Sequence, residues 1–159
     1  MITVERFKSI IMPEFKLPEE DWLRDGRLAR TIGPTNIHWE DELKRLWHIC
    51  INDSFLHDGA SVPLIARWVV DVWGPALYGA LPHDWLYRTM GGRIVSRMSR
   101  GTMTCEGEPA MISRMASDQI MLAGFSLNYP RWRAKLAFKA VRLRGKRHWG
   151  GPVPGGHSN

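Results

Sequence analysis

The alternation of apolar and polar residues gives the front of the chain the character of β-strands. Residues 43–52 alternate with a period of two, and residues 27–40 contain Gly33-Pro34, a turn signal between two short strands. Residues 1–20 are interrupted by prolines and are predicted to be extended or irregular. We therefore expect a small antiparallel sheet or hairpin on the N-terminal side.

Helical periodicity dominates the rest of the chain, in segments bounded by Pro or Gly, which commonly open or close a helix. Helices are predicted over 63–73, 76–90, 109–124 and 130–143. The segment 91–108 is rich in Gly, Ser and Arg and is expected to be a mobile loop. The predicted fold class is α+β, with a small antiparallel sheet or hairpin at the N-terminal side packed on about four helices.

Length and composition fit one domain. The chain has 159 residues, of which 44% are hydrophobic, enough to form one core. We expect a single domain over residues 1–150, with the informative motifs within 45–143, and a flexible C-terminal tail over 151–159. We expect no signal peptide, because Arg6 and Lys8 interrupt any apolar stretch there, and no transmembrane segment.

The net charge of the chain is +6, and the excess of basic residues lies near its end. Residues 131–148 contain many Lys and Arg and no acidic residue. Such a segment is typical either of a solvated helix face or of a surface that meets an anionic partner. Nucleic acid is not the expected partner, because aromatic and basic residues interleave only at 131–133. Most of the eight Trp are expected in the core, with a few at a partner surface.

A histidine and two aspartates on two of the predicted helices are the candidate catalytic residues. His83 and Asp84 are adjacent, so on a helix their side chains point about 100° apart and are expected to serve different partners in one cleft. Tyr87 lies four residues after His83, on the same face. If the two helices pack antiparallel, Asp118 faces His83 and fixes its tautomer, as in a His–Asp general-base pair.

The loop before the first predicted helix adds oxygen donors. Asp58 and Gly59 form a turn signal, and Ser61 is placed to cap a helix. Asp84 is then available to bind a divalent cation together with Asp58 or with loop carbonyl oxygens. Calcium is the expected ion, because calcium and magnesium prefer oxygen ligands, whereas a softer metal would recruit imidazole.

The same residues also fit a purely structural role. Asp58 can be only a turn former, and Ser61 only a helix cap. Arg114 lies four residues before Asp118, and the two can belong to a buried ion network that fixes the fold. A buried His83 can simply be hydrogen-bonded within the core. Both interpretations stay open at the level of the sequence.

Three sequence blocks, FLHDGASVP, LPHDWLYR and SRMASDQIML, resemble those of a known family. Together they are similar to the phage and prophage domain of unknown function 1353, over about residues 45–143. The matching residues are Asp58, Gly59, Ala60, Ser61, Pro63, His83, Asp84, Leu86, Tyr87, Arg114 and Asp118. The resemblance implies a phage or prophage origin. It implies no activity, because no activity is assigned to the family.

The HDxxY phrase is also distantly similar to the active helix of secreted phospholipases of the A-two class. That similarity implies that His83 is a general base, that Asp84 binds calcium, and that Asp118 on a second helix orients His83. Tyr87 and Arg114 would support these residues, and calcium would act as a Lewis acid. The cysteines that flank the phrase in those enzymes are absent from this sequence.

Three functions are compatible with the sequence, of which the least favoured is an inhibitor or nucleic-acid-binding accessory protein that uses the basic C-terminal region. The leading hypothesis is a phage-encoded protein with a metal-assisted His–Asp hydrolase-like site that acts on a lipid or cell-envelope ester or amide. The alternative is a non-catalytic virion or tail-associated structural protein, in which the same residues form a polar network. The expected partners are other phage structural proteins or an anionic membrane or cell-envelope surface. The expected location is the host cytoplasm or the virion.

Overall fold

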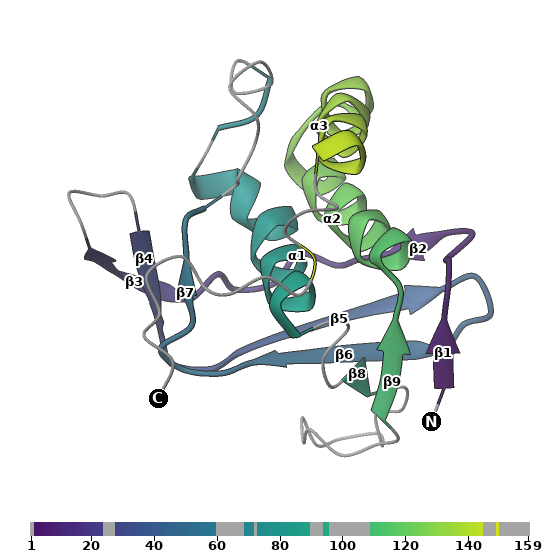
Figure 1. Cartoon of the computed structure of the whole chain (residues 1–159), viewed down its shortest axis with the longest axis horizontal. Helices are drawn as coiled ribbons and strands as arrows, with labels where there is room; N and C mark the ends of the chain where they lie inside the picture. Colours follow the sequence, from purple (N-terminus) through teal and green to yellow (C-terminus); the bar gives the residue numbers. More distant parts are fainter. Residues whose placement is uncertain are drawn as a thin grey trace.

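The computed structural model of the chain gathers its helices over one face of a β-sheet (Figure 1). It describes residues 2–23, 28–59, 69–71, 73–89, 94–95, 109–144 and 149. In chain order the elements are β1 (Ile2–Val4), β2 (Ile10–Ile11), β3 (Glu19–Leu23), β4 (Leu28–Ile32), β5 (Thr35–Asp41), β6 (Leu46–Ile51), β7 (Leu56–His57), the 3-10 turn η2 (Gly74–Ala76), α1 (Leu77–Thr89), β8 (Ile94–Val95), β9 (Pro109–Ile112), α2 (Arg114–Asn128) and α3 (Arg131–Arg144).

The predicted fold class, a small sheet packed on about four helices, is wrong. The described residues form nine strands in two sheets, together with three α-helices. The strands that were not predicted include very short ones, such as β2 and β8, which have two residues each. A segment of that length is too short to show a period of two, and pairing with distant segments makes it a strand.

The larger sheet has the strand order β1-β9-β8-β6-β5-β2. Its two longest strands, β5 and β6, form an antiparallel hairpin in which Trp39 lies opposite Trp47. β1 forms one edge of this sheet and pairs in parallel with β9, so segments more than a hundred residues apart in the chain lie side by side. The smaller sheet has the order β3-β4-β7. The predicted turn between β4 and β5 is confirmed, and Gly33 occupies it with a φ of 79°.

Two of the predicted helices are confirmed, and a third begins later than expected. The helix expected over 76–90 is α1, and the one expected over 130–143 is α3. Residues 109–112 form strand β9 instead of a first helical turn. The α2 helix starts only after Ser113, whose side chain accepts a hydrogen bond from the N–H of Ala116 and so caps the helix.

Several expectations concern residues outside those that the structure describes. They are most of the helix predicted over 63–73, most of the loop over 91–108, and the tail over 151–159. Within the described residues, no helix has both the length and the apolar character needed to cross a bilayer.

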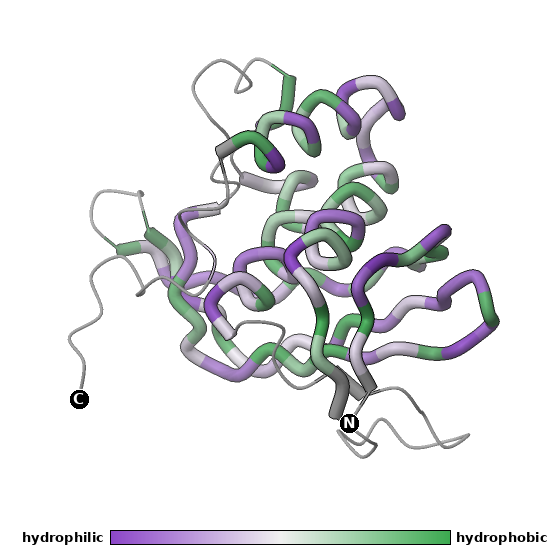
Figure 2. The backbone as a smooth tube through the Cα atoms, turned by 45° about the vertical axis from the view of Figure 1, so that its right-hand side comes forward, coloured by the Kyte–Doolittle hydropathy of each residue, from purple (hydrophilic) through white to green (hydrophobic). Residues whose placement is uncertain are grey.

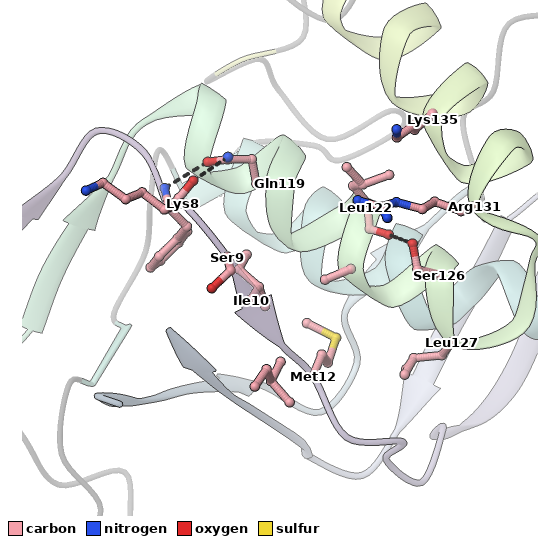
Figure 3. Close-up of a pocket in the computed structure, with 13 residues that line it drawn as sticks. Lys8, Ser9, Ile10, Met12, Gln119, Leu122, Ser126, Leu127, Arg131 and Lys135 are labelled. Carbon is pink, nitrogen blue, oxygen red and sulfur yellow. Dashed lines mark hydrogen bonds between the residues drawn. The ribbon is translucent and has the colours of Figure 1, made fainter. Parts of the chain in front are cut away.

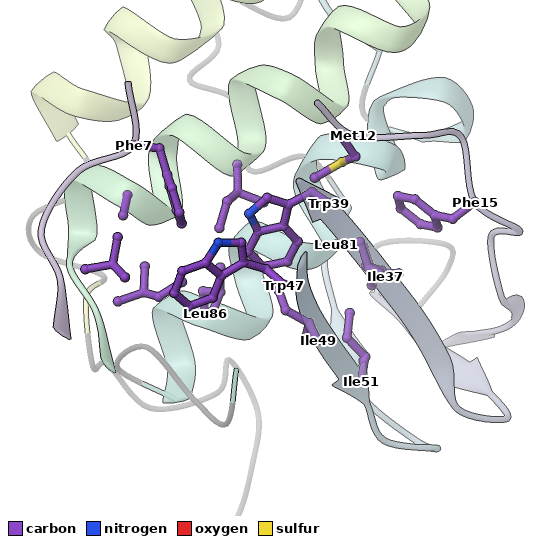
Figure 4. Packing of buried hydrophobic residues seen from close by; sticks show 14 residues of the cluster. Phe7, Met12, Phe15, Ile37, Trp39, Trp47, Ile49, Ile51, Leu81 and Leu86 are labelled. Carbon is purple, nitrogen blue, oxygen red and sulfur yellow. The ribbon is translucent and has the colours of Figure 1, made fainter. Parts of the chain in front are cut away.

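The main core lies between the larger sheet and the helices (Figure 4). The rings of Trp39 and Trp47 are both fully buried and stack at 6.4 Å, and Phe7 meets the Trp47 ring edge-on at 5.6 Å. Leu81 and Leu86 of α1 pack onto the same cluster. Hydrophobic stretches alternate with hydrophilic ones along the helices, so each helix can bury one face (Figure 2). A second apolar cluster joins α1, α2 and α3 to one another.

Candidate functional site

The carboxylate of Asp118, fully buried where the three helices meet, is the centre of the candidate site. Its Oδ1 lies 3.0 Å from Nε2 of His83 and accepts a 2.6 Å hydrogen bond from the Tyr87 hydroxyl. Its Oδ2 accepts a 2.7 Å bond from the guanidinium of Arg142. The predicted contact between His83 and Asp118 is therefore present, and two further side chains bind the same carboxylate.

The spacing of four residues on α1 explains why two α1 side chains reach one oxygen. His83 and Tyr87 project from the same face of α1, as predicted. Their ring centroids lie 4.0 Å apart with the planes tilted by 35°. Tyr87 is also covered from outside, because Trp149 packs edge-on against its ring at 5.0 Å. The site is thus held by α1, α2, α3 and one residue that follows α3.

Burial and hydrogen bonding set the charges at this junction. Burial opposes ionisation of Asp118, but hydrogen bonds from His83, Tyr87 and Arg142 outweigh it and lower the pKa of the carboxyl below its ordinary value. Burial and the bond to Asp118 raise the pKa of the Tyr87 hydroxyl. An ionised Asp118 accepts but does not donate, so the hydrogen of the 3.0 Å contact belongs to Nε2 of His83.

The second nitrogen of His83 faces Asp84. Nδ1 lies 3.4 Å from Oδ1 of Asp84, so the adjacent side chains approach each other, contrary to the expectation that they would serve only different partners. That distance is long for a hydrogen bond. Burial favours the neutral imidazole, but the bonds to Asp118 and Asp84 outweigh it and raise the pKa of His83 above its ordinary value.

A cation at Asp84 remains a prediction. Oδ2 of Asp84 is buried and has no hydrogen-bond partner within the described part of the chain, so this oxygen fits an additional ligand. However, the described residues bring together no group of three His, Cys, Asp or Glu side chains that could hold a metal ion. One carboxylate oxygen alone is a small part of the six to eight ligands that calcium takes.

The loop residues expected to help bind the cation are placed only in part. Asp58 is half-buried directly after β7, and Gly59 follows with a φ of 72°. Ser61 lies outside the described residues. The guanidinium of Arg88 donates a hydrogen bond to the carbonyl of Leu56, so the start of this loop lies against α1. The two sequence blocks are therefore neighbours in space.

Two residues of the site were not predicted from the sequence. Arg142 belongs to a basic helix that was interpreted as a solvated face or an anion-binding surface. It directly follows Val141, which is buried on the face that α3 turns toward α2 and α1. A basic residue at the border of an apolar stripe was the available signal for an inward-pointing guanidinium. Trp149 had no such signal, because no periodic apolar pattern surrounds it in the sequence.

The predicted supporting residue Arg114 lies near the network but does not bind its carboxylate. Its guanidinium nitrogens lie 3.5 Å from the carbonyl oxygen of Arg142, which is the limit of a hydrogen bond. Its positive charge also acts on Tyr87, where it opposes the rise of the pKa. Arg114 therefore steadies the surroundings of Asp118, whereas Arg142 supplies the direct ion pair.

The comparison with known proteins gives a family and no activity. The model of a family described as "Protein of unknown function (DUF1353)" matches residues 35–141, which is more than half of the chain. This match begins at β5, includes His83 and Asp118, and ends one residue before Arg142. No curated protein and no solved structure matches the chain. The phage origin that the resemblance implied stays a prediction.

Proposed function

Since the chain belongs to the DUF1353 family, whose function is unknown, we propose a function from the site itself: a hydrolase-like His–Asp pair. In this proposal His83 activates a water molecule and Asp118 orients the imidazole. The observation behind it is the 3.0 Å contact between Nε2 of His83 and Oδ1 of Asp118. Tyr87 and Arg142 bind the remaining positions of that carboxylate, so its orientation is fixed.

Nδ1 of His83 is the atom that takes the proton in this reaction. In the neutral imidazole, which is the form that acts as the base, Asp118 fixes the hydrogen on Nε2 and leaves the lone pair on Nδ1. Nδ1 accepts a proton from water while the water oxygen bonds to the carbonyl carbon of an ester or amide. The bond to the leaving oxygen or nitrogen then breaks, and the proton passes from Nδ1 to that leaving group. Asp118 stays ionised throughout and stabilises the imidazolium that forms between the two transfers.

The proposal assigns the divalent cation, with calcium as the expected ion, to Asp84 and Asp58. The buried, unpartnered Oδ2 of Asp84 supports this assignment. When bound, such an ion supplies Lewis-acid polarisation of the substrate carbonyl. The side chains of the protein itself have two roles: His83 transfers the protons, and Asp118 orients the His83 imidazole.

We infer the substrate class from charge. The α3 helix has six Lys or Arg residues and no acidic residue, which favours an anionic substrate or surface. A lipid or cell-envelope ester or amide has this character, and a phage-encoded protein would meet one at the host envelope.

The burial of the network favours a second candidate function. His83 is only 7% exposed, and Asp118 is not exposed at all. A polar network that joins three helices can serve to fix their packing, with no turnover. In that case the protein is a non-catalytic virion or tail-associated structural protein, and its exposed side chains, such as Trp132, meet other phage proteins.

One experiment separates the two functions. The wild type, His83→Ala and Asp118→Asn are incubated with a chromogenic ester, phosphatidylglycerol vesicles and peptidoglycan, with calcium or with a chelator, and product release is measured. The hydrolase proposal expects turnover by the wild type that falls about 10²–10⁴-fold in His83→Ala, assayed at a temperature where the variant is folded. His38→Ala on β5 is the matched control and keeps its activity. Absence of turnover on every substrate, together with a lowered melting temperature in His83→Ala, would favour the structural function.

A further inference from the structure

A groove of about 470 Å³ lies between the N-terminal segment around β2 and the helices α2 and α3 (Figure 3). Gln119 lines this groove, whereas its neighbour Asp118 points to His83. Successive helical residues project about 100° apart, so the groove and the His–Asp site lie on different faces of α2. The apolar lining consists of Phe7, Ile10, Ile11, Met12, Leu122, Ala123 and Leu127.

Three cations stand at the rim of this groove. Arg131 and Lys135 lie one turn apart on α3, and Lys8 lies on the N-terminal segment. All three side chains are exposed, and none forms an ion pair with a residue in the described ranges. No acidic residue lines the groove. Positive charges without an ion-pair partner in the described ranges, beside an apolar wall, favour a ligand that is anionic at one end and apolar at the other.

Large apolar side chains extend from the groove onto the surface. Ile11, which lines the groove, is 60% exposed. Trp132 and Leu136, which directly follow the two rim cations of α3, are 52% and 41% exposed. A Trp and aliphatic side chains interleaved with Lys and Arg are typical of helices that lie in a membrane interface.

Two polar side chains that line the groove already have hydrogen-bond partners. The side-chain amide of Gln119 accepts a bond from the N–H of Phe7 and donates one to its carbonyl. The hydroxyl of Ser126 donates to the carbonyl of Leu122. Neither side chain is available to the N–H and C=O groups of a bound peptide, whereas an acyl chain needs no such partners. The lining therefore fits a lipid chain better than a peptide.

We propose that this groove binds an anionic phospholipid at the surface of a bilayer. An acyl chain occupies the apolar wall, and the phosphate lies beside Arg131 and Lys135 of α3. Trp132 and Leu136 enter the interface beside it. The inference goes beyond the proposed hydrolase function and does not rest on it, because binding at the groove needs no chemistry at His83.

The test is flotation with vesicles of phosphatidylcholine alone and of phosphatidylcholine mixed with phosphatidylglycerol. The wild type is expected to bind only the anionic vesicles. The double variant Arg131→Glu/Lys135→Glu is expected to lose about tenfold or more in affinity, since each basic residue near an anionic surface contributes about 1 kcal/mol. The matched control Lys16→Glu/Lys44→Glu has the same net charge and alters exposed residues outside the groove, so it is expected to bind like the wild type.

A second variant tests the groove without a change of charge. Ser126 is exposed on α2 and lines the groove, so Ser126→Phe is expected to fill it, keep the fold and weaken binding to anionic vesicles. Equal losses in the two double variants would show a response to total charge and overturn the proposal. Wild-type binding by Ser126→Phe would also overturn it. So would a wild type that ignores anionic vesicles but binds an acidic amphipathic peptide, which would assign the groove to a protein partner.

Discussion

Gly79 of α1 and Gly124 of α2 lie against each other where the two helices cross. A Cβ atom added to Gly124 would overlap the carbonyl oxygen of Tyr78 and lie 2.6 Å from the Cα of Gly79. The two glycines therefore allow the helix backbones to approach closely. This approach sets the separation at which His83, one turn along α1, reaches Asp118 on α2.

We predict that Gly124→Ala destabilises the protein by about 1–3 kcal/mol in a denaturant titration, because the helices have no room for the methyl group. In an open helix the same change would stabilise by about 1 kcal/mol, so the sign of the effect is informative. Ser126→Ala, at an exposed position of the same helix, serves as the control and is expected to stay within about 0.5 kcal/mol of the wild type. A stabilised Gly124→Ala variant would show that the crossing is not tight.

The Tyr87 hydroxyl can be removed with little change in packing. Tyr87→Phe keeps the ring between His83 and Trp149 but deletes the 2.6 Å bond to Asp118. We expect a loss of about 1–2 kcal/mol in the free energy of unfolding, measured by urea titration. A variant as stable as the wild type would mean that this hydrogen bond makes no net contribution to the free energy of unfolding.

Arg142 provides a test of the buried ion pair. Arg142→Met removes the cation that binds Oδ2 of Asp118, so we expect a loss of about 2–4 kcal/mol, because a buried carboxylate is left without its charged partner. Arg142→Lys retains a positive charge and is expected to lose less. Thermal unfolding of both variants beside the wild type measures the difference. Equal losses in the two variants would point to the shape of the guanidinium rather than its charge.

Asp41 should make the stability of the protein depend on pH. Burial raises the pKa of this carboxyl, but bonds from Trp47, Arg45 and Leu43 outweigh it, so the folded pKa lies below the ordinary value of 3.8. A lowered folded pKa means that the contribution is complete above the unfolded pKa and is lost as the pH falls through the folded one. In urea titrations, the stability gap between wild type and Asp41→Asn is therefore expected to shrink below about pH 4. A gap of constant size down to pH 2 would contradict this linkage.

The parts of the fold that could be predicted from the sequence are those determined by neighbouring residues. The turn at Gly33 and the strand around Trp47 were identified because alternation and turn chemistry are local signals. β1 and β9 were missed, since β1 becomes a strand by pairing with β9 across more than a hundred residues, and β9 pairs with both β1 and β8. The helical start assigned to Pro109 was wrong for the same reason: Pro can open a helix, but here the pairing with β1 prevails.

The site was predictable to the extent that it depends on helix periodicity. His83 and Asp118 could be paired because two helices of suitable spacing pack antiparallel. Arg142 could not be assigned to Asp118, because the sequence of α3 does not indicate which of its residues lie beside which residues of α2. Contacts between elements far apart in the chain depend on packing, which a single sequence does not display.

The side-chain amide of Gln119 forms two hydrogen bonds with the backbone of Phe7, and these bonds can form only late in synthesis on the ribosome. Phe7 completes the aromatic core, and β1 completes the larger sheet, yet both need segments made about a hundred residues later. During translation, β1 therefore stays unpaired and the Phe7 ring stays exposed to solvent until α2 has emerged from the exit tunnel. Folding that requires contacts between the first and the last segments of a chain is slow and prone to aggregation. We therefore expect the protein to depend on chaperones during translation.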